Sequence, residues 1–379
     1  MNCLRFWELA RELLRLPTAA YHEHFVVGAI REFVAGREFG YQEDRYGNIR
    51  LSYQGLKGDT VPTLVATAHL DHPALGWVST IAKHEHAFEC LGRLPIERIL
   101  GAPVRIYNTN SGPVEYVRAS VFGEIDDDKL DIGVRVDHGQ PTELVGPGSF
   151  AIWDLPEPQR RGFRIHAGAC DDLAGVAVGL CWLEQLSLQR CRESAMLLLT
   201  RAEEIGFGGM LAAAKGETLD PCLSYVNIEC SSTLSGAILG KGPVIRVGDR
   251  RSVFDSGVAG ALAHIADCCR ADIDGFRFQR KLMDSGTCEA TVLQHAGYAT
   301  GAVALPLGNY HNLGRGKLQR EVIDARDAEM LVDLLTALTT HDSGIKGARK
   351  RADESLTQLL EGYHRESEPR LLQSVPRPL

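Results

Sequence analysis

Apolar and polar residues recur with two different periods along the chain. A helical period, in which apolar residues return every three or four positions, runs through residues 4–35 with a break at Pro17, and again from Leu173 to Gln189. Short runs of β-forming and small apolar residues predict buried strands. These runs are residues 63–71, 195–200, 223–229 and 299–307. Strands that alternate with helices predict an α/β fold with a mostly parallel sheet sandwiched by helices.

Residues 77–161 have a different pattern. Short alternating segments such as VRIYN and LDIGVRV are separated by Gly, Pro and Asn, which is typical of a small β-sandwich or barrel. We therefore expect an α/β catalytic domain, built from residues 1–76 and 162–345, that is interrupted by an inserted β domain at 77–161. Residues 346–379 are charged and have helical propensity but few core residues, so we expect a partly helical, peripheral tail.

Composition narrows the possible partners and location. The net charge of the 379 residues is −8, which disfavours nucleic acid and an anionic membrane surface, because both attract basic proteins. No apolar run is long enough for a membrane span, and Arg and Glu interrupt the first apolar residues, unlike a signal peptide. The ten cysteines contain no C-x-x-C pair and are interpreted as reduced thiols. We expect a cytoplasmic protein.

Ionisable residues follow each of the four predicted central strands. In an open α/β sheet the ligand crevice lies at the carboxyl ends of the strands, so four strands would deliver imidazoles and carboxylates to one edge of the sheet. The residues at these strand ends are His69 and Asp71, Glu203 and Glu204, Glu229, and His311.

Two imidazoles and several carboxylates, with no thiolate, suit Zn²⁺, and also Co²⁺ or Mn²⁺. So many clustered carboxylates would repel one another without a cation. Two divalent ions would remove this repulsion, share a bridging water and lower its pKa. If strand alternation continues through Glu203 and Glu204, their side chains point in opposite directions, so that one binds metal and the other takes the proton of the water.

Each of these residues, taken alone, has a simpler interpretation. The Asp171-Asp172 pair could cap the helix that starts at Leu173, because Asp is a preferred N-cap residue. His69 could be a histidine in a turn, and Glu203 and Glu204 could be solvated surface residues. Glu229 could be a strand-end carboxylate paired with an arginine, and His311 could be a loop histidine. Their joint occurrence at the strand ends of one chain favours the metal centre.

Four segments together resemble the M42 glutamyl-aminopeptidase-like family of cocatalytic metallopeptidases, which is related to the M28 and M20 families. These segments are AHLDH, GACDDLAG, AEEIGFGG and LPLGNYHN. The resemblance extends from Leu4 to about His341. It implies a zinc aminopeptidase-like fold with an inserted β domain, two divalent metal ions, a small peptide as substrate, and a large homo-oligomer.

The resemblance also implies a role for each candidate residue and a cis peptide bond between Asp171 and Asp172. By position, Asp171 would bridge the two metals, His69 and Glu229 would bind one of them, and Glu204 and His311 would bind the other. Glu203 would be the general base, and Asp71 would orient His69. Three positions depart from the family pattern. They are Glu229 where the family usually has Asp, His72 in place of Glu, and Cys288 in place of Asp.

We therefore expect an aminopeptidase that cleaves the N-terminal amide bond of small peptides, with Glu203 activating the bridging water. An N-acyl amino acid deacylase or a dipeptidase could use the same site. A glycoside hydrolase with Glu203 and Glu229 as its carboxylate pair is a further alternative, although an aromatic content of 7% offers few sugar-stacking surfaces. The last alternative is an inactive scaffold, which would have no reason to keep such a charged cluster.

Overall fold

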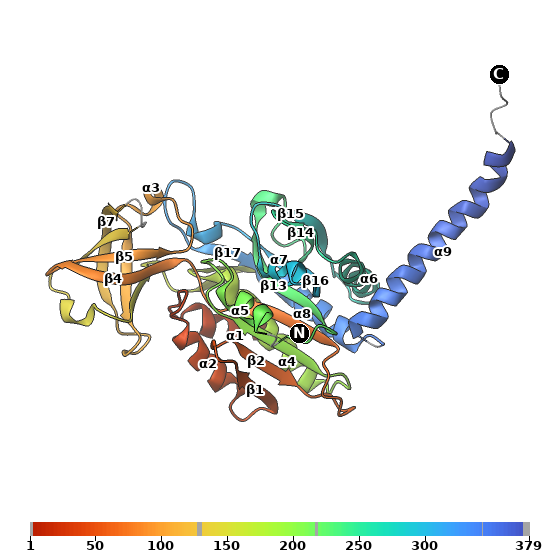
Figure 1. Cartoon of the computed structure of the whole chain (residues 1–379), viewed down its shortest axis with the longest axis horizontal. Helices are drawn as coiled ribbons and strands as arrows, with labels where there is room; N and C mark the ends of the chain where they lie inside the picture. The colour runs from red at the N-terminus through yellow and green to blue at the C-terminus, as the bar shows by residue number, and fades with distance from the viewer. Residues whose placement is uncertain (1–2, 127–130, 217–218, 343, 374–379) are drawn as a thin grey trace, which may run out of the picture.

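A computed structural model of the chain describes residues 3–126, 131–216, 219–342 and 344–373. Its centre is an eight-stranded sheet (Figure 1). In spatial order the strands are β1 (Phe39–Glu43), β2 (Ile49–Tyr53), β12 (Ala195–Thr200), β3 (Leu64–His69), β13 (Ser224–Ser232), β16 (Ala299–Leu307), β14 (Val244–Asp249) and β15 (Gln279–Met283). The four strands predicted from sequence are β12, β3, β13 and β16, and they lie side by side in parallel. The prediction of a mostly parallel sheet is confirmed.

Alternate residues of the central strands pack into two different cores, because successive side chains of a strand point to opposite faces. On one face, β-strand residues such as Ala66 and Ile228 pack against four longer helices. These helices are α1 (Cys3–Leu14), α4 (Cys170–Leu188), α6 (Ser256–Asp272) and α8 (Ala325–Thr340). On the other face, Val65 and Leu198 pack against the short helices α5 (Gly208–Lys215) and α7 (Glu289–His295). Helix α2 (His24–Val34) contributes Val26, Ile30 and Phe33 to the larger core. The sheet is therefore covered on both faces.

The β-rich stretch forms a closed six-stranded barrel, which lies to the side of the sheet (Figure 1). In spatial order its strands are β4 (Ala74–Ala82), β5 (Glu85–Leu91), β8 (Asp131–Val136), β7 (Val117–Asp126), β6 (Pro103–Asn108) and β9 (Ser149–Trp153), and the short helix α3 (Ile96–Ile99) lies between β5 and β6. The barrel has a hydrophobic core of its own, which includes the fully buried Phe88 and Val134. Because of this separate core, we propose that the α/β residues on either side of the barrel form one catalytic domain.

A three-stranded antiparallel sheet follows the barrel. It consists of β10 (Gln159–Arg161), β11 (Arg164–Ala167) and β17 (Glu321–Asp324). Strand β11 leads directly into α4, and β17 leads into α8, so this small sheet holds the starts of two core helices together.

The last described element is helix α9 (Gly344–Gln373), which begins against the α/β layers and then projects away from them (Figure 1). Ile345 and Ala348 in its first turns are buried, whereas most later side chains are exposed. A helical tail was predicted from the sequence. No helix among the described residues is both long enough and apolar enough to cross a membrane.

Candidate metal centre

The ends of the parallel strands bring the candidate residues together. His69 is the last residue of β3, and Glu229 lies in the second half of β13. Asp171 lies at the start of α4, and His311 follows β16. These four side chains are buried. The peptide bond between Asp171 and Asp172 is cis, as the family resemblance implied.

Asp171 lies between the two histidines. Its Oδ1 is 3.5 Å from Nε2 of His69, and its Oδ2 is 3.8 Å from Nε2 of His311. Nε2 of His69 is also 3.8 Å from Oε1 of Glu229, and Nε2 of His311 is 3.2 Å from Oε2 of Glu204. The side chains thus form two groups of three, His69–Asp171–Glu229 and Asp171–Glu204–His311, each with its ligand atoms within 4.8 Å of one another. Both groups use Asp171.

The polar atoms at the centre of these groups fit metal ions. Five buried atoms make no hydrogen bond with any described residue: Nε2 of His69, Nε2 of His311, Oδ1 of Asp171, Oε1 of Glu204 and Oε2 of Glu229. Buried polar atoms are rarely left without a partner, because desolvation without compensation costs about 1–3 kcal/mol per group. Imidazole nitrogens and carboxylate oxygens are ligands of Zn²⁺ and similar divalent ions. Divalent cations would therefore satisfy all five atoms at once.

The pKa values of the cluster reflect the close packing of its carboxyl groups. Burial raises the pKa of Glu229, and burial together with the charges of Glu229 and Glu204 raises the pKa of Glu203 well above its usual value. Burial acts to lower the pKa of His311, but Glu204 and Asp171 outweigh it and raise this pKa to about 9. Without a cation, the cluster therefore retains protons. Binding a metal would release them.

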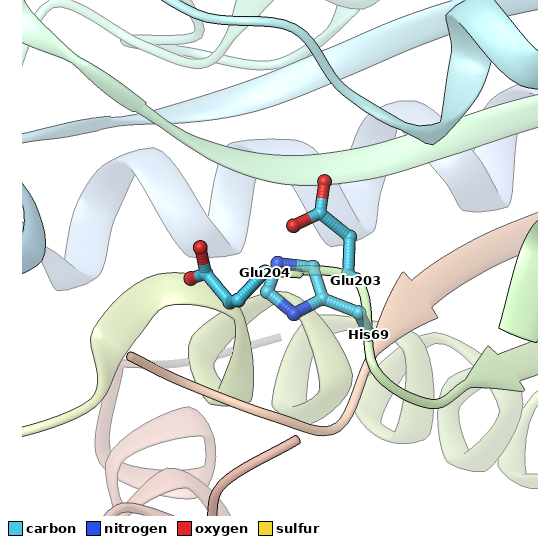
Figure 2. A group of neighbouring side chains, drawn as sticks. All are labelled: His69, Glu203 and Glu204. Atoms are coloured by element: carbon cyan, nitrogen blue, oxygen red, sulfur yellow. The ribbon is translucent and has the colours of Figure 1, made fainter. Parts of the chain in front are cut away.

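Glu203 and Glu204 lie on a turn rather than on a strand. Strand β12 ends at Thr200, so the two side chains do not continue its alternation, and that part of the prediction is wrong. Ala202 has a φ of 54°, and the carboxylate of Asp71 accepts the backbone N–H groups of Glu203 (2.9 Å) and Glu204 (3.0 Å). Figure 2 shows the two carboxylates on different sides of the His69 ring. The turn, held by Asp71, sets their directions.

Asp71 also lies beside His69. Nδ1 of His69 is 3.2 Å from the backbone carbonyl oxygen of Asp71 and 3.5 Å from its carboxylate Oδ1. An acceptor at Nδ1 favours a proton on that nitrogen, which leaves Nε2 free to bind a metal. Asp71 is thus placed to position three side chains of the site.

Sequence reasoning missed Glu321, the first residue of β17. Its Oε1 accepts the backbone N–H of His311 (2.8 Å), and its Oε2 accepts the backbone N–H of Asp171 (3.0 Å). Burial raises the pKa of this carboxyl group to about 7. Glu321 belongs to no recognisable motif, and the pairing of β17 with β11 and with Gly308 brings it to the site.

His72 and Cys288 depart from the family pattern, and the structure shows the surroundings of both residues. His72 is buried, and its Nδ1 lies 2.6 Å from the carbonyl oxygen of Asp171, while its Nε2 lies 3.1 Å from Oδ1 of Asn312. His72 therefore helps to hold the backbone of Asp171 in place. Cys288 is also buried. The carboxyl group of the next residue, Glu289, is buried as well, and burial raises its pKa to about 8.

Comparisons with known proteins agree with this geometry. The family model of M42 glutamyl aminopeptidase matches residues 47–334. An aminopeptidase from the archaeon Desulfurococcus kamchatkensis has a similar structure, with a TM-score of 0.75 and 21% identity, over 92% of this chain and 98% of that one. The TET1 peptidase of Pyrococcus horikoshii, which can assemble into a tetrahedron or a large octahedral shell, gives a TM-score of 0.73 and 20% identity, over 89% and 100% of the two chains.

An endoglucanase from Thermotoga maritima is also similar, with a TM-score of 0.68 and 20% identity over 89% of this chain and 99% of that one. A search of curated proteins found no match. Structural likeness at these identities shows a shared fold, whereas the family model covers most of the sequence. The chain therefore belongs to the M42 glutamyl aminopeptidase family and is a metal-dependent aminopeptidase.

Proposed function

We propose that the enzyme uses two metal ions to remove the N-terminal residue of small peptides. The observation that carries this proposal is the position of Asp171, whose two carboxylate oxygens face two different imidazoles. A carboxylate shared in this way is suited to bridge two cations a few ångströms apart. We propose Zn²⁺ as the metal, with Co²⁺ or Mn²⁺ as alternatives.

In this proposal His69 and Glu229 hold one ion with Asp171, and Glu204 and His311 hold the other. Bound in this way, the metals would polarise the scissile carbonyl group and lower the pKa of a bound water. Glu203 would accept the proton of that water and then donate it to the leaving amine. The buried position of Glu203 suits this role, because burial raises its pKa and favours the protonated form between the two transfers.

Metal content and activity measured on the same samples test the proposal. We expect about two divalent ions per chain by elemental analysis, loss of p-nitroanilide hydrolysis after chelation, and recovery with Zn²⁺, Co²⁺ or Mn²⁺. Glu203→Gln should keep both ions while kcat falls by about 10²–10⁴-fold, the usual contribution of a general base. Glu204→Gln is the matched control and should weaken metal binding itself. A folded protein that binds none of the three metals would refute the proposal.

A pocket beside the metal centre supports a preference for an acidic N-terminal side chain. Its walls include Glu229, Arg246, Ser231 and Thr287. Arg246 is only 2% exposed, and its Nη1 donates to Oγ of Ser231 at 3.1 Å, while its Nε has no hydrogen-bond partner among the described residues. A buried guanidinium group is costly unless an anion pairs with it, so the pocket suits a substrate carboxylate.

Arg246→Met tests this preference. We expect KM for a glutamyl p-nitroanilide to rise at least tenfold, with a much smaller change for the leucyl compound. The alternative is that Arg246 only balances the charge of Glu229, whose pKa it lowers against the effect of burial. In that case both substrates would be affected equally and metal binding would weaken.

The alternative reactions have their own tests. Hydrolysis of N-acetylated peptides in preference to free-amine peptides would indicate a deacylase, and activity confined to dipeptides would indicate a dipeptidase. The similarity to a protein named endoglucanase makes a cellulose assay worthwhile. However, Glu229 lies in a histidine–carboxylate group suited to a metal, and the family is one of peptidases, so we expect no cellulase activity.

We also propose that the enzyme forms a homo-oligomer. The support is the fold shared with the TET1 peptidase, which can assemble into closed shells. The cytoplasmic location stays a prediction from sequence.

A further inference from the structure

Glu23, the residue before helix α2, lies beside the turn that carries Glu203. Its side chain is fully buried, and its carboxylate faces four N–H groups. Oε1 accepts the backbone N–H groups of Ala202 at 3.0 Å and of Tyr21 at 3.1 Å. Oε2 accepts the Nε–H of Arg201 at 2.9 Å and lies 2.8 Å from its Nη2. One carboxylate therefore holds both residues that precede Glu203.

Further contacts fix Arg201 itself. Its Nη1 donates to the carbonyl oxygen of Tyr46 at 3.1 Å, and its Nη2 donates to that of Tyr21 at 3.2 Å. Its backbone N–H donates to Oδ1 of the buried Asn48 at 3.2 Å, and Nδ2 of Asn48 donates to the carbonyl oxygen of Gly209 at 3.0 Å. The start of the turn is thus tied to the segment before α2, to the connection between β1 and β2, and to helix α5.

Ala202 needs such support because its φ of 54° lies in the left-handed region. A residue with a side chain keeps this conformation only where the surrounding contacts favour it. The backbone angles of Ala202 set the direction in which the chain enters Glu203. The carboxylate of Asp71 accepts the next two backbone N–H groups, so Glu23 and Asp71 together fix three consecutive residues of the turn.

The segment that carries Glu23 is itself held against the barrel. The ring of His22 stacks on that of Phe150 in β9, with the ring centroids 4.9 Å apart. Ala20 and Ala202 belong to the same buried apolar cluster as Phe150. The segment before α2 therefore contacts the barrel on one side and the turn on the other.

We propose that Glu23 is a positioning residue for catalysis, which acts through Ala202 and Arg201 to hold the Glu203 carboxylate where it can accept the proton of the water. This proposal rests on the proposed function, in which Glu203 is the general base. Glu23 precedes residue 47, where the match to the family model begins. The proposal thus gives a part in catalysis to a segment that contributes no ligand to the proposed metal centre.

Glu23→Gln and Glu23→Asp test the proposal. Glutamine keeps the length but has one acceptor oxygen, so its NH₂ group must face either the guanidinium group of Arg201 or the two backbone N–H groups. Aspartate keeps the charge but is shorter by one CH₂ group, so it cannot reach Arg201 and Ala202 together. For both variants we expect kcat for a p-nitroanilide to fall roughly tenfold or more, with KM within about threefold and metal content unchanged.

Glu184→Gln is the matched control. The carboxylate of Glu184 also pairs with the Nε and Nη2 of an arginine, Arg5, at 2.8 and 2.6 Å, and this pair joins α1 to α4. The control should lower the free energy of unfolding without changing kcat. A wild-type kcat in both Glu23 variants, with lowered stability alone, would show a purely structural role and overturn the proposal. A wild-type kcat in Glu23→Asp alone would show that the charge matters rather than the position, and would overturn it too.

A double-mutant cycle tests whether Glu23 acts through Glu203. In the Glu203→Gln background, adding Glu23→Gln should leave the residual kcat unchanged within about twofold, because the base is already absent. A further loss as large as that in the wild-type background would overturn the proposal. A fully active Glu203→Gln enzyme would refute the proposed function, and the role of Glu23 with it. A crippled Glu203→Gln enzyme beside a fully active Glu23→Gln enzyme would refute the role of Glu23 alone.

Arg201→Lys interrupts the same path from the other side and takes the place of Glu23→Gln in the cycle if that variant does not fold. The Arg201 side chain is 30% exposed, so the substitution disturbs the core less than a change at Glu23. Lysine keeps the charge, but its single nitrogen cannot contact Glu23, Tyr21 and Tyr46 together. We expect kcat to fall by roughly threefold or more, with metal content unchanged; an unchanged kcat would contradict the proposed path.

Discussion

The carboxylate of Asp71 fixes the turn that carries Glu203 and Glu204, and Asp71→Asn is the substitution that most directly tests the importance of this turn. Burial alone would raise the pKa of Asp71, but His69 and the two backbone N–H groups together lower it below the usual value. The group is therefore an ionised double acceptor at neutral pH. Asparagine has the same size but only one acceptor oxygen, so it must place its NH₂ group against one of the backbone N–H groups.

The expected loss of activity follows from the free energy of the lost hydrogen bond. A hydrogen bond to a charged group contributes about 1.5–3 kcal/mol, and the Asp71→Asn variant would lose at least one of the two. That free energy corresponds to a roughly 10- to 150-fold smaller population of the correctly folded turn, because each ~1.4 kcal/mol changes an equilibrium tenfold. We therefore expect kcat/KM of Asp71→Asn to fall by about this factor, with weaker binding of the metal that Glu204 would hold.

Steady-state hydrolysis of a p-nitroanilide, with metal content measured on the same samples, provides the assay. Asp327→Asn is the matched control, because Asp327 also accepts two backbone N–H groups, those of Gly240 and Gly242, at 2.7 Å each. The control should lower the free energy of unfolding without changing metal content or kcat/KM. The reasoning would be refuted if Asp71→Asn kept both quantities within about threefold of the wild-type values.

Further predictions concern the support of the metal centre and the core. Glu321→Gln should lower metal affinity by about 10–100-fold, as measured by competition with a chelating dye, because one of two backbone N–H groups loses its acceptor. Metal affinity should rise with pH from about 6 towards 9, because the raised pKa of His311, about 9, makes protons compete with the metal; a pH-independent affinity by calorimetry would contradict this. Gly209→Ala should also weaken metal binding, since a Cβ there would lie 2.5 Å from the backbone nitrogen of Arg201, next to the turn; unchanged metal content would argue against it. Trp182→Ala should reduce the free energy of unfolding by about 3–5 kcal/mol in urea titrations, because this side chain is fully buried.

Local patterns in the sequence were sufficient to predict the four central strands and to single out His69, Asp171, Glu204, Glu229 and His311, which the structure places close together. The four central strands are continuous apolar runs, which buried parallel strands require, and the ionisable residues lie near or just beyond their carboxyl ends. The spatial order of the strands was not predictable in this way. Strand β12 lies between β2 and β3, and this order depends on contacts between distant segments.

The directions of Glu203 and Glu204 depend on a distant contact of the same kind. The strand-alternation argument used only neighbouring residues, whereas the turn is set by Asp71, which lies 132 residues before Glu203 in the chain. Glu321 was missed because its role comes from strand pairing and from no feature of its own segment. In each case the prediction would have needed a contact between segments that lie far apart in the chain.

The barrel separates the metal-centre residues into two groups along the chain. His69 and Asp71 precede β4, and Asp171 follows β9. The contact between His72 and the carbonyl oxygen of Asp171 therefore closes a loop of about 100 residues, and such a closure is costly in chain entropy unless the loop is already compact. A barrel that folds on its own core before the sheet is complete would bring the two segments close together. Newly made chains would then bind metal only after the barrel has closed, so that peptidase activity would follow completion of the fold.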